Sequence, residues 1–206
     1  MEATIVNRRN KIHPWKFALW LGCGSITMMF AAWTSAYVVR QAAGNWLEFR
    51  LPNIFFYNTI VIVLSSVALQ GSYIAFKREK EFLYKFLLIL AALLGFAFVS
   101  LQYVGWTELR NIGIELTTNP SGSFIYVLTA FHVIHVLAGI GVLSVALVHA
   151  FALKFKPTAK RKLRFELSLT YWHFVDFFMG LSIGVFCFTK LKSFLLLNYT
   201  LNRVIK

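Results

Sequence analysis

Five ionisable side chains lie inside long apolar runs of this sequence, and they are the residues best suited to chemistry. They are His132, His135, His149, His173 and Asp176. An ionisable group at the centre of a bilayer costs at least ~2.5–3.5 kcal/mol, so it is usually paired or functional. At 100° per residue, the three histidines between 132 and 149 fall within an arc of about 100° on one helix, and Glu166 falls within about 80° of His173 and Asp176 on another. This spacing predicts two polar stripes on two helices.

Haem ligation and transport are two functions that such stripes suggest. A bis-histidine haem needs two histidines at similar depth on different helices. At a rise of 1.5 Å per residue, His132 and His135 lie about 10–15 Å below one membrane surface, whereas His173 lies about 10 Å from the other and His149 lies at its edge. The depths do not match. A transporter with a central site favours broken helices and repeated halves, and the sequence has neither.

The remaining interpretation is a structural polar network in a non-catalytic subunit. We expect this network to consist of Glu166, His173 and Asp176 together with His132 and His135. We expect no catalytic residue, no cofactor-binding residue and no metal ligand in the chain. The two cysteines form no C-x-x-C motif, and their depths differ too much for a disulfide.

The composition identifies the elements that must position these side chains. The chain has 206 residues, of which 58% are hydrophobic and 14% are charged, and its formal charge is +13. Soluble domains are less apolar and more charged. The basic residues lie in clusters between apolar runs, which is typical of membrane topology and argues against a nucleic-acid partner.

Uninterrupted apolar segments predict an all-α membrane protein, a bundle of five transmembrane helices in a single domain. The predicted spans are about 15–39, 54–76, 86–106, 124–153 and 167–189. The segments lack the period-two alternation of a membrane barrel strand. The four prolines all lie outside these segments.

The distribution of Lys and Arg predicts the orientation. Fourteen of the 21 lie before or at the very start of the first span (Lys16 included), between the second and third spans, or between the fourth and fifth. The positive-inside rule therefore places the N-terminus in the cytoplasm and the C-terminus outside. The tail, 190–206, either extends the fifth span or lies along the membrane interface.

Small residues predict where helices approach closely. Gly180 and Gly184 lie one turn apart in the fifth span, and Gly139 lies in the fourth. Glycines at this spacing allow two helix backbones to pack tightly. We expect these three glycines at helix contacts.

The most specific motif of the sequence is Glu166-x4-Tyr171-Trp172-His173-Phe174-Val175-Asp176. Earlier segments contain, in order, Pro52, Asn58-Thr59, Ser65-Ser66, Gly95, Gln102, Trp106 and Thr129-x-Phe131-His132-x-x-His135-Val136-x-x-Gly139. All these segments resemble subunit III of the haem-copper terminal oxidases, the family of cytochrome c oxidase and cytochrome bo-type quinol oxidase. Together they cover nearly the whole chain, and its length resembles the five-helix bacterial form.

This resemblance implies a non-catalytic subunit of a proton-translocating oxidase in the aerobic electron transport chain. It implies a multi-pass protein of the bacterial inner membrane that packs directly on subunit I, contacts other oxidase subunits and membrane lipids, and binds phospholipid. A larger respiratory supercomplex is a further option. Haem and copper would lie in partner subunits. The chain departs from the family at Ile26, where a membrane-embedded Glu is frequent, and at Met179, where Trp is usual.

Two alternatives stay open at this point. One is the homologous accessory subunit of a nitric-oxide reductase, which differs mainly in its partner. The other is a lipid-organising assembly factor that has no stable place in an oxidase.

Overall fold

The structure, a computed structural model, describes residues 13–42, 47, 51–117, 119–152 and 158–204 of the chain. It contains five helices: α1 (Pro14–Ala42), α2 (Ile54–Lys77), α3 (Glu81–Asn111), α4 (Pro120–Ala152) and α5 (Ala159–Val204). No strand occurs in these described segments. The predicted all-α fold is confirmed.

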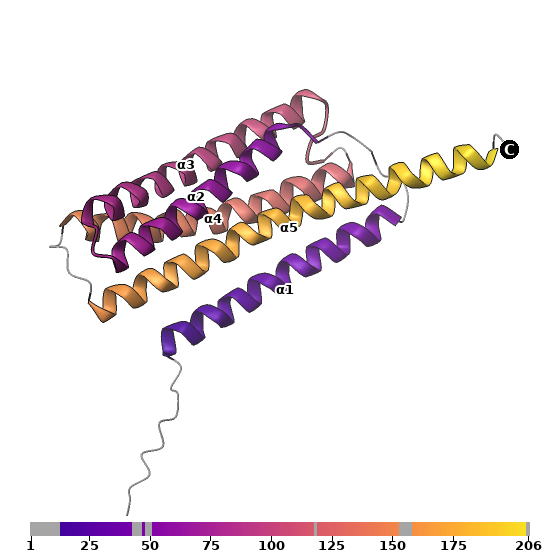
Figure 1. Cartoon of the computed structure of the whole chain (residues 1–206). Coiled ribbons are helices and arrows are strands. Elements are labelled where there is room, and N and C mark those ends of the chain that lie inside the picture. The colour runs from indigo at the N-terminus through magenta and orange to yellow at the C-terminus, as the bar shows by residue number, and fades with distance from the viewer. Residues whose placement is uncertain (1–12, 43–46, 48–50, 118, 153–157, 205–206) are drawn as a thin grey trace, which may run out of the picture.

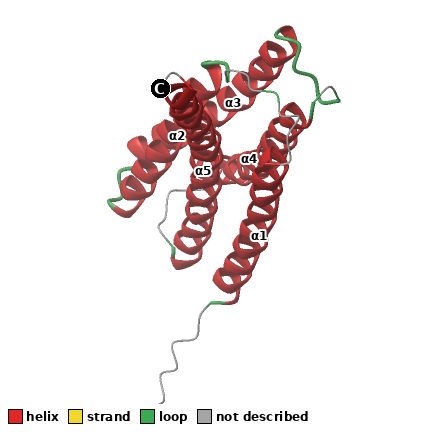
Figure 2. Ribbon diagram, turned by 90° about the vertical axis from the view of Figure 1, so that its right-hand side faces the viewer, coloured by secondary structure: helices red, strands yellow, loops and turns green. Residues whose placement is uncertain are grey.

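Helices α2 to α5 form a four-helix bundle, and α1 is attached to one side of it. Helix α2 packs against α3 and α5, and α4 packs against the same two helices. Helix α1 contacts α4 and α5 but neither α2 nor α3. Figures 1 and 2 show α1 on the far side of α4 and α5 from the α2–α3 pair. One end of the bundle holds the N-terminus of α1, the α2–α3 turn and the start of α5, and we call it the α2–α3 end (Figure 1). We call the opposite end the α3–α4 end.

The helix boundaries follow from local backbone chemistry. Pro14 and Pro120 are the first residues of α1 and α4, where the missing N–H of proline costs little. Gly113 follows α3 with φ of 79°, and Ile114 N–H donates to Leu109 O at 3.0 Å. This left-handed residue with its 6→1 hydrogen bond closes the helix as a Schellman motif.

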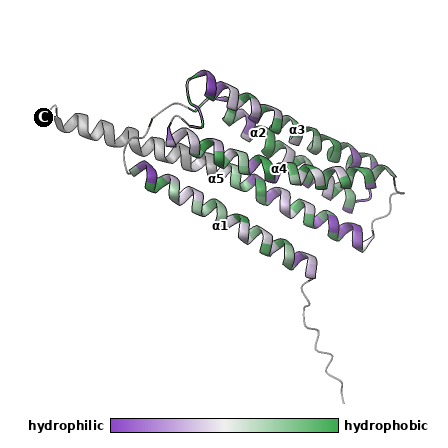
Figure 3. Ribbon diagram, turned by 180° about the vertical axis from the view of Figure 1, so that it is seen from behind, coloured by the Kyte–Doolittle hydropathy of each residue, from purple (hydrophilic) through white to green (hydrophobic). Residues whose placement is uncertain are grey.

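Four of the five helices, α1 to α4, are long and apolar enough to cross a membrane. In Figure 3, hydrophobic residues dominate their central turns and hydrophilic residues gather near the ends of the bundle. Over its described residues α5 does not meet the same criterion, so the fifth span at 167–189 and the orientation of the termini stay predictions.

Helix α5 continues into the segment predicted as a tail. Its 46 residues run without a break to Val204, so the backbone of 190–204 extends the helix. At 1.5 Å per residue this helix is about 70 Å long, more than twice the ~30 Å hydrocarbon core. Its C-terminal part projects beyond the four-helix bundle (Figure 1).

The main core lies between α2, α3, α4 and α5 and is built from large apolar side chains and small residues. Leu69, Leu88 and Phe98 are fully buried there, as is Ala91. A smaller cluster of Phe30, Leu128 and Phe178, with side chains packed around it, attaches α1 to the bundle. Small residues permit close helix approach where lipid offers no hydrophobic driving force.

Candidate functional site

The residues that resemble the oxidase family lie at contacts between helices. On the α2–α3 interface, Ser65 Oγ donates to Ala91 O at 2.8 Å. Asn58 Nδ2 donates to Gln102 Oε1, also at 2.8 Å, and both side chains are only 1% exposed. Side-chain hydrogen bonds of this kind link membrane helices because lipid offers no competing partner.

Trp172 of α5 lies between two glycines on two other helices. A Cβ added to Gly139 of α4 would lie 2.9 Å from the indole ring, and one added to Gly95 of α3 would lie 3.0 Å from it. Trp172 itself is 2% exposed. Glycine at both positions lets the bulky ring fit among α3, α4 and α5. Gly139 therefore lies at the contact between α4 and α5.

The other two glycines predicted to pack are placed differently. A Cβ added to Gly180 or Gly184 would meet nothing within 4 Å among the residues whose positions are described. Both glycines are exposed. The expected close approach at this pair is therefore absent from the described part of the bundle, because this face of α5 points away from its helix neighbours.

The side chain of His173 makes hydrogen bonds to side chains of α2. Its Nδ1 lies in hydrogen-bond contact with Ser66 Oγ, and its Nε2 donates to Gln70 Oε1 at 3.2 Å. Because the amide oxygen only accepts, Nε2 carries the proton, and a neutral ring then accepts the Ser66 proton at Nδ1. His173 thus joins α5 to α2.

Asp176 and His132 are the most deeply buried members of the predicted network. Asp176 is 9% exposed, and Ser66 lies within hydrogen-bonding reach of it. His132 is 3% exposed, and its ring lies edge-on to Phe98 with centroids 5.6 Å apart. Neither nitrogen of His132 has a hydrogen-bond partner among the described residues.

The other histidines of α4 bond to their own helix. His135 Nδ1 donates to Phe131 O at 2.7 Å, and the ring packs against Phe30 of α1. His149 is exposed, and its Nδ1 donates to Val145 O at 2.8 Å. Among the described residues, no three His, Cys, Asp or Glu side chains form a group that could hold a metal ion.

Glu166 joins three helices at the α2–α3 end. Its Oε1 accepts from Tyr73 OH at 2.7 Å, and its Oε2 pairs with Lys16 Nζ at 3.1 Å. The Tyr73 hydrogen bond and the Lys16 ammonium hold the pKa of Glu166 below its usual value, against a smaller opposing effect of burial. Helices α1, α2 and α5 therefore share one carboxylate.

The five predicted network residues thus occur in separate groups. The sequence placed the α5 stripe opposite the α4 histidines, but Glu166 and His173 contact α2 instead. The cause is the helix order: α5 packs between α2 and α4, and its polar stripe faces α2. The α4 histidines diverge because His132 points into the core and His135 faces α1.

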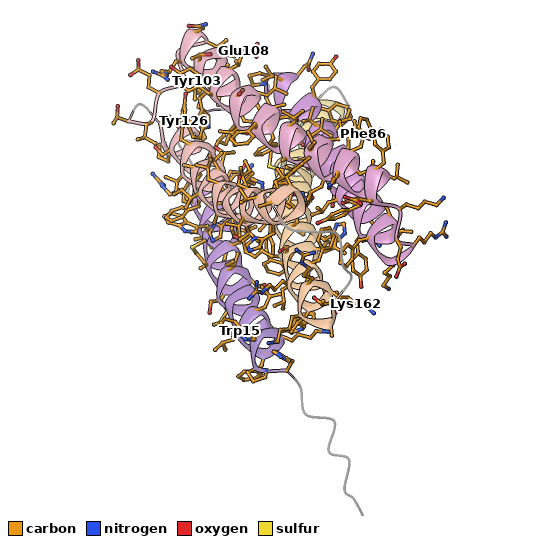
Figure 4. The ribbon with its side chains drawn as sticks, turned by 90° about the vertical axis from the view of Figure 1, so that its left-hand side faces the viewer. Trp15, Phe86, Tyr103, Glu108, Tyr126 and Lys162 are labelled. Atoms are coloured by element: carbon orange, nitrogen blue, oxygen red, sulfur yellow. The ribbon has the colours of Figure 1, made fainter. Side chains whose placement is uncertain are left out.

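A second set of polar contacts closes the α3–α4 end. Trp106 Nε1 donates to Thr129 Oγ1 at 3.0 Å. Tyr126 OH donates to Ile114 O at 3.0 Å, which ties the loop after α3 to α4. Figure 4 shows Tyr126 and Glu108 at this end and Trp15 and Lys162 at the opposite one.

A cavity of about 800 Å³ lies at the α2–α3 end. Trp15 and Leu19 of α1, Ala146 of α4, and Arg161 and Arg164 of α5 are among its lining residues. The walls are mostly apolar, and the two arginines lie in the first two turns of α5. A cavity with apolar walls and cationic residues suits an amphipathic anion.

The two departures from the family pattern lie in apolar surroundings. Ile26 packs against the cluster of Phe30, Leu128 and Phe178. Met179 is 2% exposed in the main core. Sequence reasoning missed Lys16 and Tyr73 as partners of Glu166, although all three lie near the predicted inner ends of their spans.

Fold and contacts together define a polytopic helical membrane protein whose helices are joined by buried polar and aromatic contacts. A family model described as cytochrome c oxidase subunit III matches residues 46–190. The chain belongs to the cytochrome c oxidase subunit III family, which confirms the resemblance seen in the sequence.

Individual relatives agree with this assignment. The chain is 30% identical over 168 residues to a protein of Nocardia farcinica named probable cytochrome c oxidase subunit 3, covering 77% of this chain and 78% of that one. It is 32% identical to the protein of that name from Mycobacterium bovis, covering 72% of each. It is 31% identical to cytochrome c oxidase subunit 3 of Coturnix japonica over 58% of this chain, which is 44% of that protein.

Proposed function

We propose that this chain is a non-catalytic subunit III of a proton-translocating haem-copper oxidase in aerobic respiration. In this role it packs directly on subunit I in the bacterial inner membrane, contacts other oxidase subunits, and stabilises the lipid and proton environment of the catalytic helices. Haem and copper belong to the partner subunits.

The match of the subunit III family over 46–190 carries this proposal. Additional support comes from where the matching residues lie. Asn58 bonds to Gln102, and Trp172 fits against Gly139, so the shared residues are those that position the helices.

The cavity supports the lipid part of the proposal. Its volume of about 800 Å³ and its apolar walls suit acyl chains, and Arg161 and Arg164 suit an anionic headgroup. Each basic residue near a membrane surface attracts anionic lipid by ~1 kcal/mol. We infer that one or more anionic phospholipids bind there.

Copurification tests the proposed partner. The full chain, tagged and expressed in its own host, is isolated in mild detergent, and its partners are identified by mass spectrometry and by the reduced-minus-oxidised spectrum. We expect a haem-copper oxidase subunit I in stoichiometric amount. A nitric-oxide reductase catalytic subunit, or no stable partner, contradicts the proposal.

A redox measurement tests the non-catalytic role. The chain is purified alone and examined by the same spectrum and by metal analysis. We expect no stoichiometric haem or copper. A bound redox centre would overturn this part of the proposal and leave the partner assignment standing.

A further inference from the structure

We propose that the interior of the four-helix bundle binds ordered water between Asn58, Gln102 and His132. These side chains come from α2, α3 and α4 and are 1%, 1% and 3% exposed. The ligand class is a small neutral molecule that both donates and accepts hydrogen bonds. This inference does not depend on which catalytic subunit the chain assembles with.

The three side chains are connected through one face of α3. Asn58 and Gln102 are joined directly, at 2.8 Å. On α3, Gln102 lies one turn from Phe98, which contacts the His132 ring, and one turn from Trp106, which bonds to Thr129 of α4. One helical turn rises ~5.4 Å, so the α3 contacts with α4 on either side of Gln102 place it within about one turn of the level of His132.

Each of the three residues has buried polar atoms that no described residue satisfies. Asn58 Oδ1 and Gln102 Nε2 are left over after the two amides form their single mutual bond. Both nitrogens of the His132 ring are also without a partner within the described chain. Most buried side-chain polar atoms in proteins have a protein or water partner.

The chemistry of these atoms matches water. Asn58 Oδ1 only accepts, and Gln102 Nε2 only donates. A neutral His132 ring has one donor and one acceptor. A water molecule offers two of each, and buried waters typically make about three hydrogen bonds to otherwise unsatisfied groups. Lipid does not suit this site, because the three side chains are buried among protein helices.

X-ray footprinting of the assembled complex tests the proposal, because ionised bound water produces hydroxyl radicals at its own position. The readout is oxidation of Phe98, which is 0% exposed. We expect Phe98 to be oxidised in the wild type and several-fold more slowly in His132→Leu. Ser65→Ala is the matched control, since Ser65 is equally buried but already bonded to Ala91 O.

A wild-type Phe98 that stays unoxidised at doses that oxidise solvent-exposed aromatic residues overturns the proposal, and this result needs no variant. An unchanged Phe98 rate in a folded His132→Leu complex overturns it as well. Electron cryomicroscopy of the wild-type complex gives a second readout. Water density ~2.6–3.2 Å from atoms of at least two of the three residues supports the proposal, and a dry interior contradicts it.

Discussion

Trp172 connects three helices through one rigid ring. Its indole lies against Gly139 of α4 and Gly95 of α3, so both backbones approach it where no side chain intervenes. An aromatic ring adjusts less readily than a flexible side chain. The two glycines therefore fix how closely α5 approaches α3 and α4.

We predict that Gly139→Ala destabilises the protein by ~1–3 kcal/mol, the usual cost of overpacking. The new methyl group would lie 2.9 Å from two ring carbons of Trp172. Thermal unfolding of the detergent-solubilised protein measures the effect. Gly141→Ala is the control, because no atom of the described residues lies within 4 Å of its added Cβ and alanine is the better helix former. Equal unfolding midpoints for the two variants would contradict this account.

Sequence predicted part of this site because residue type limits what a buried position can do. Glu166, His173 and Asp176 were expected in one network, and each does lie at or near a helix contact. Their partners were not predictable, since helical periodicity gives the face of a helix but not the neighbour that the face meets. The spacing of Gly180 and Gly184 indicated packing for the same reason, yet their face has no neighbour in the described bundle.

At the scale of the elements, α1 is the least firmly held helix. The only side chains that it buries well among its described residues are Cys23, Phe30 and Tyr37. The Lys16–Glu166 pair fastens its first turn, with side-chain exposures of 44% and 29%. A partly exposed pair of this kind contributes less than about 1 kcal/mol.

We predict that acidification loosens the first turns of α1. Because the folded-state pKa of Glu166 is lowered, its contribution is present above the ordinary carboxyl pKa and is lost as the pH falls through the lowered value. Hydrogen exchange of α1 amides, corrected for intrinsic rates, measures this loss. We expect Glu166→Gln to show the loosened state at every pH, and Glu108→Gln, at the exposed opposite end, to behave as wild type. A pH-independent wild type would refute this role of Glu166.

The α2–α3 turn carries a local strain that can be relieved. Glu79 has φ of 56°, a left-handed conformation that costs an L-residue roughly 1–2 kcal/mol. We predict that Glu79→Gly stabilises the protein by about 0.5–1 kcal/mol, because part of the gain is offset by the greater freedom of glycine when unfolded. Thermal unfolding again measures it. Arg78→Gly, at φ of −88°, should be destabilising, and a stabilised Arg78→Gly would contradict the explanation.

At the scale of the whole molecule, the sequence predicted the helical architecture well. Four of the spans predicted from hydropathy are helices that are long and apolar enough to cross a membrane. The prediction works because backbone N–H and C=O groups in lipid must be hydrogen-bonded within their own segment, which favours a helix. Hydropathy did not predict that α2 to α5 close a four-helix ring with α1 outside, since the order of helices in space depends on packing. The sequence left open whether the tail extends the fifth span or lies along the interface, because the tail mixes apolar and polar residues; the backbone of 190–204 continues the helix.

The position of α1 gives the molecule a cavity that no single helix contains. Trp15 and Leu19 of α1 line it, together with Arg161 and Arg164 of α5. If the subunit brings no redox group to an oxidase, as proposed above, it can act on the oxidase only by shaping its surroundings. The two physical routes are holding lipid and excluding solvent at the catalytic helices, or supplying protons from the cytoplasmic side. Ile26, which packs in an apolar cluster, offers no carboxylate for the second route.

We therefore predict that removing this subunit leaves the initial rate of oxygen consumption largely unchanged but shortens the active lifetime of the oxidase. The Arg161→Gln/Arg164→Gln variant should move in the same direction, because losing two cations near the membrane surface costs ~2 kcal/mol, or roughly thirtyfold, in anionic lipid binding. Added anionic phospholipid should restore part of the lifetime. Lys160→Gln/Lys162→Gln is the control, because it also removes two positive charges from the start of α5, at exposed positions that are not among the residues lining the cavity. Progress curves of oxygen consumption measure both quantities. An immediate large fall in initial rate at neutral pH, without faster inactivation, would instead favour proton delivery.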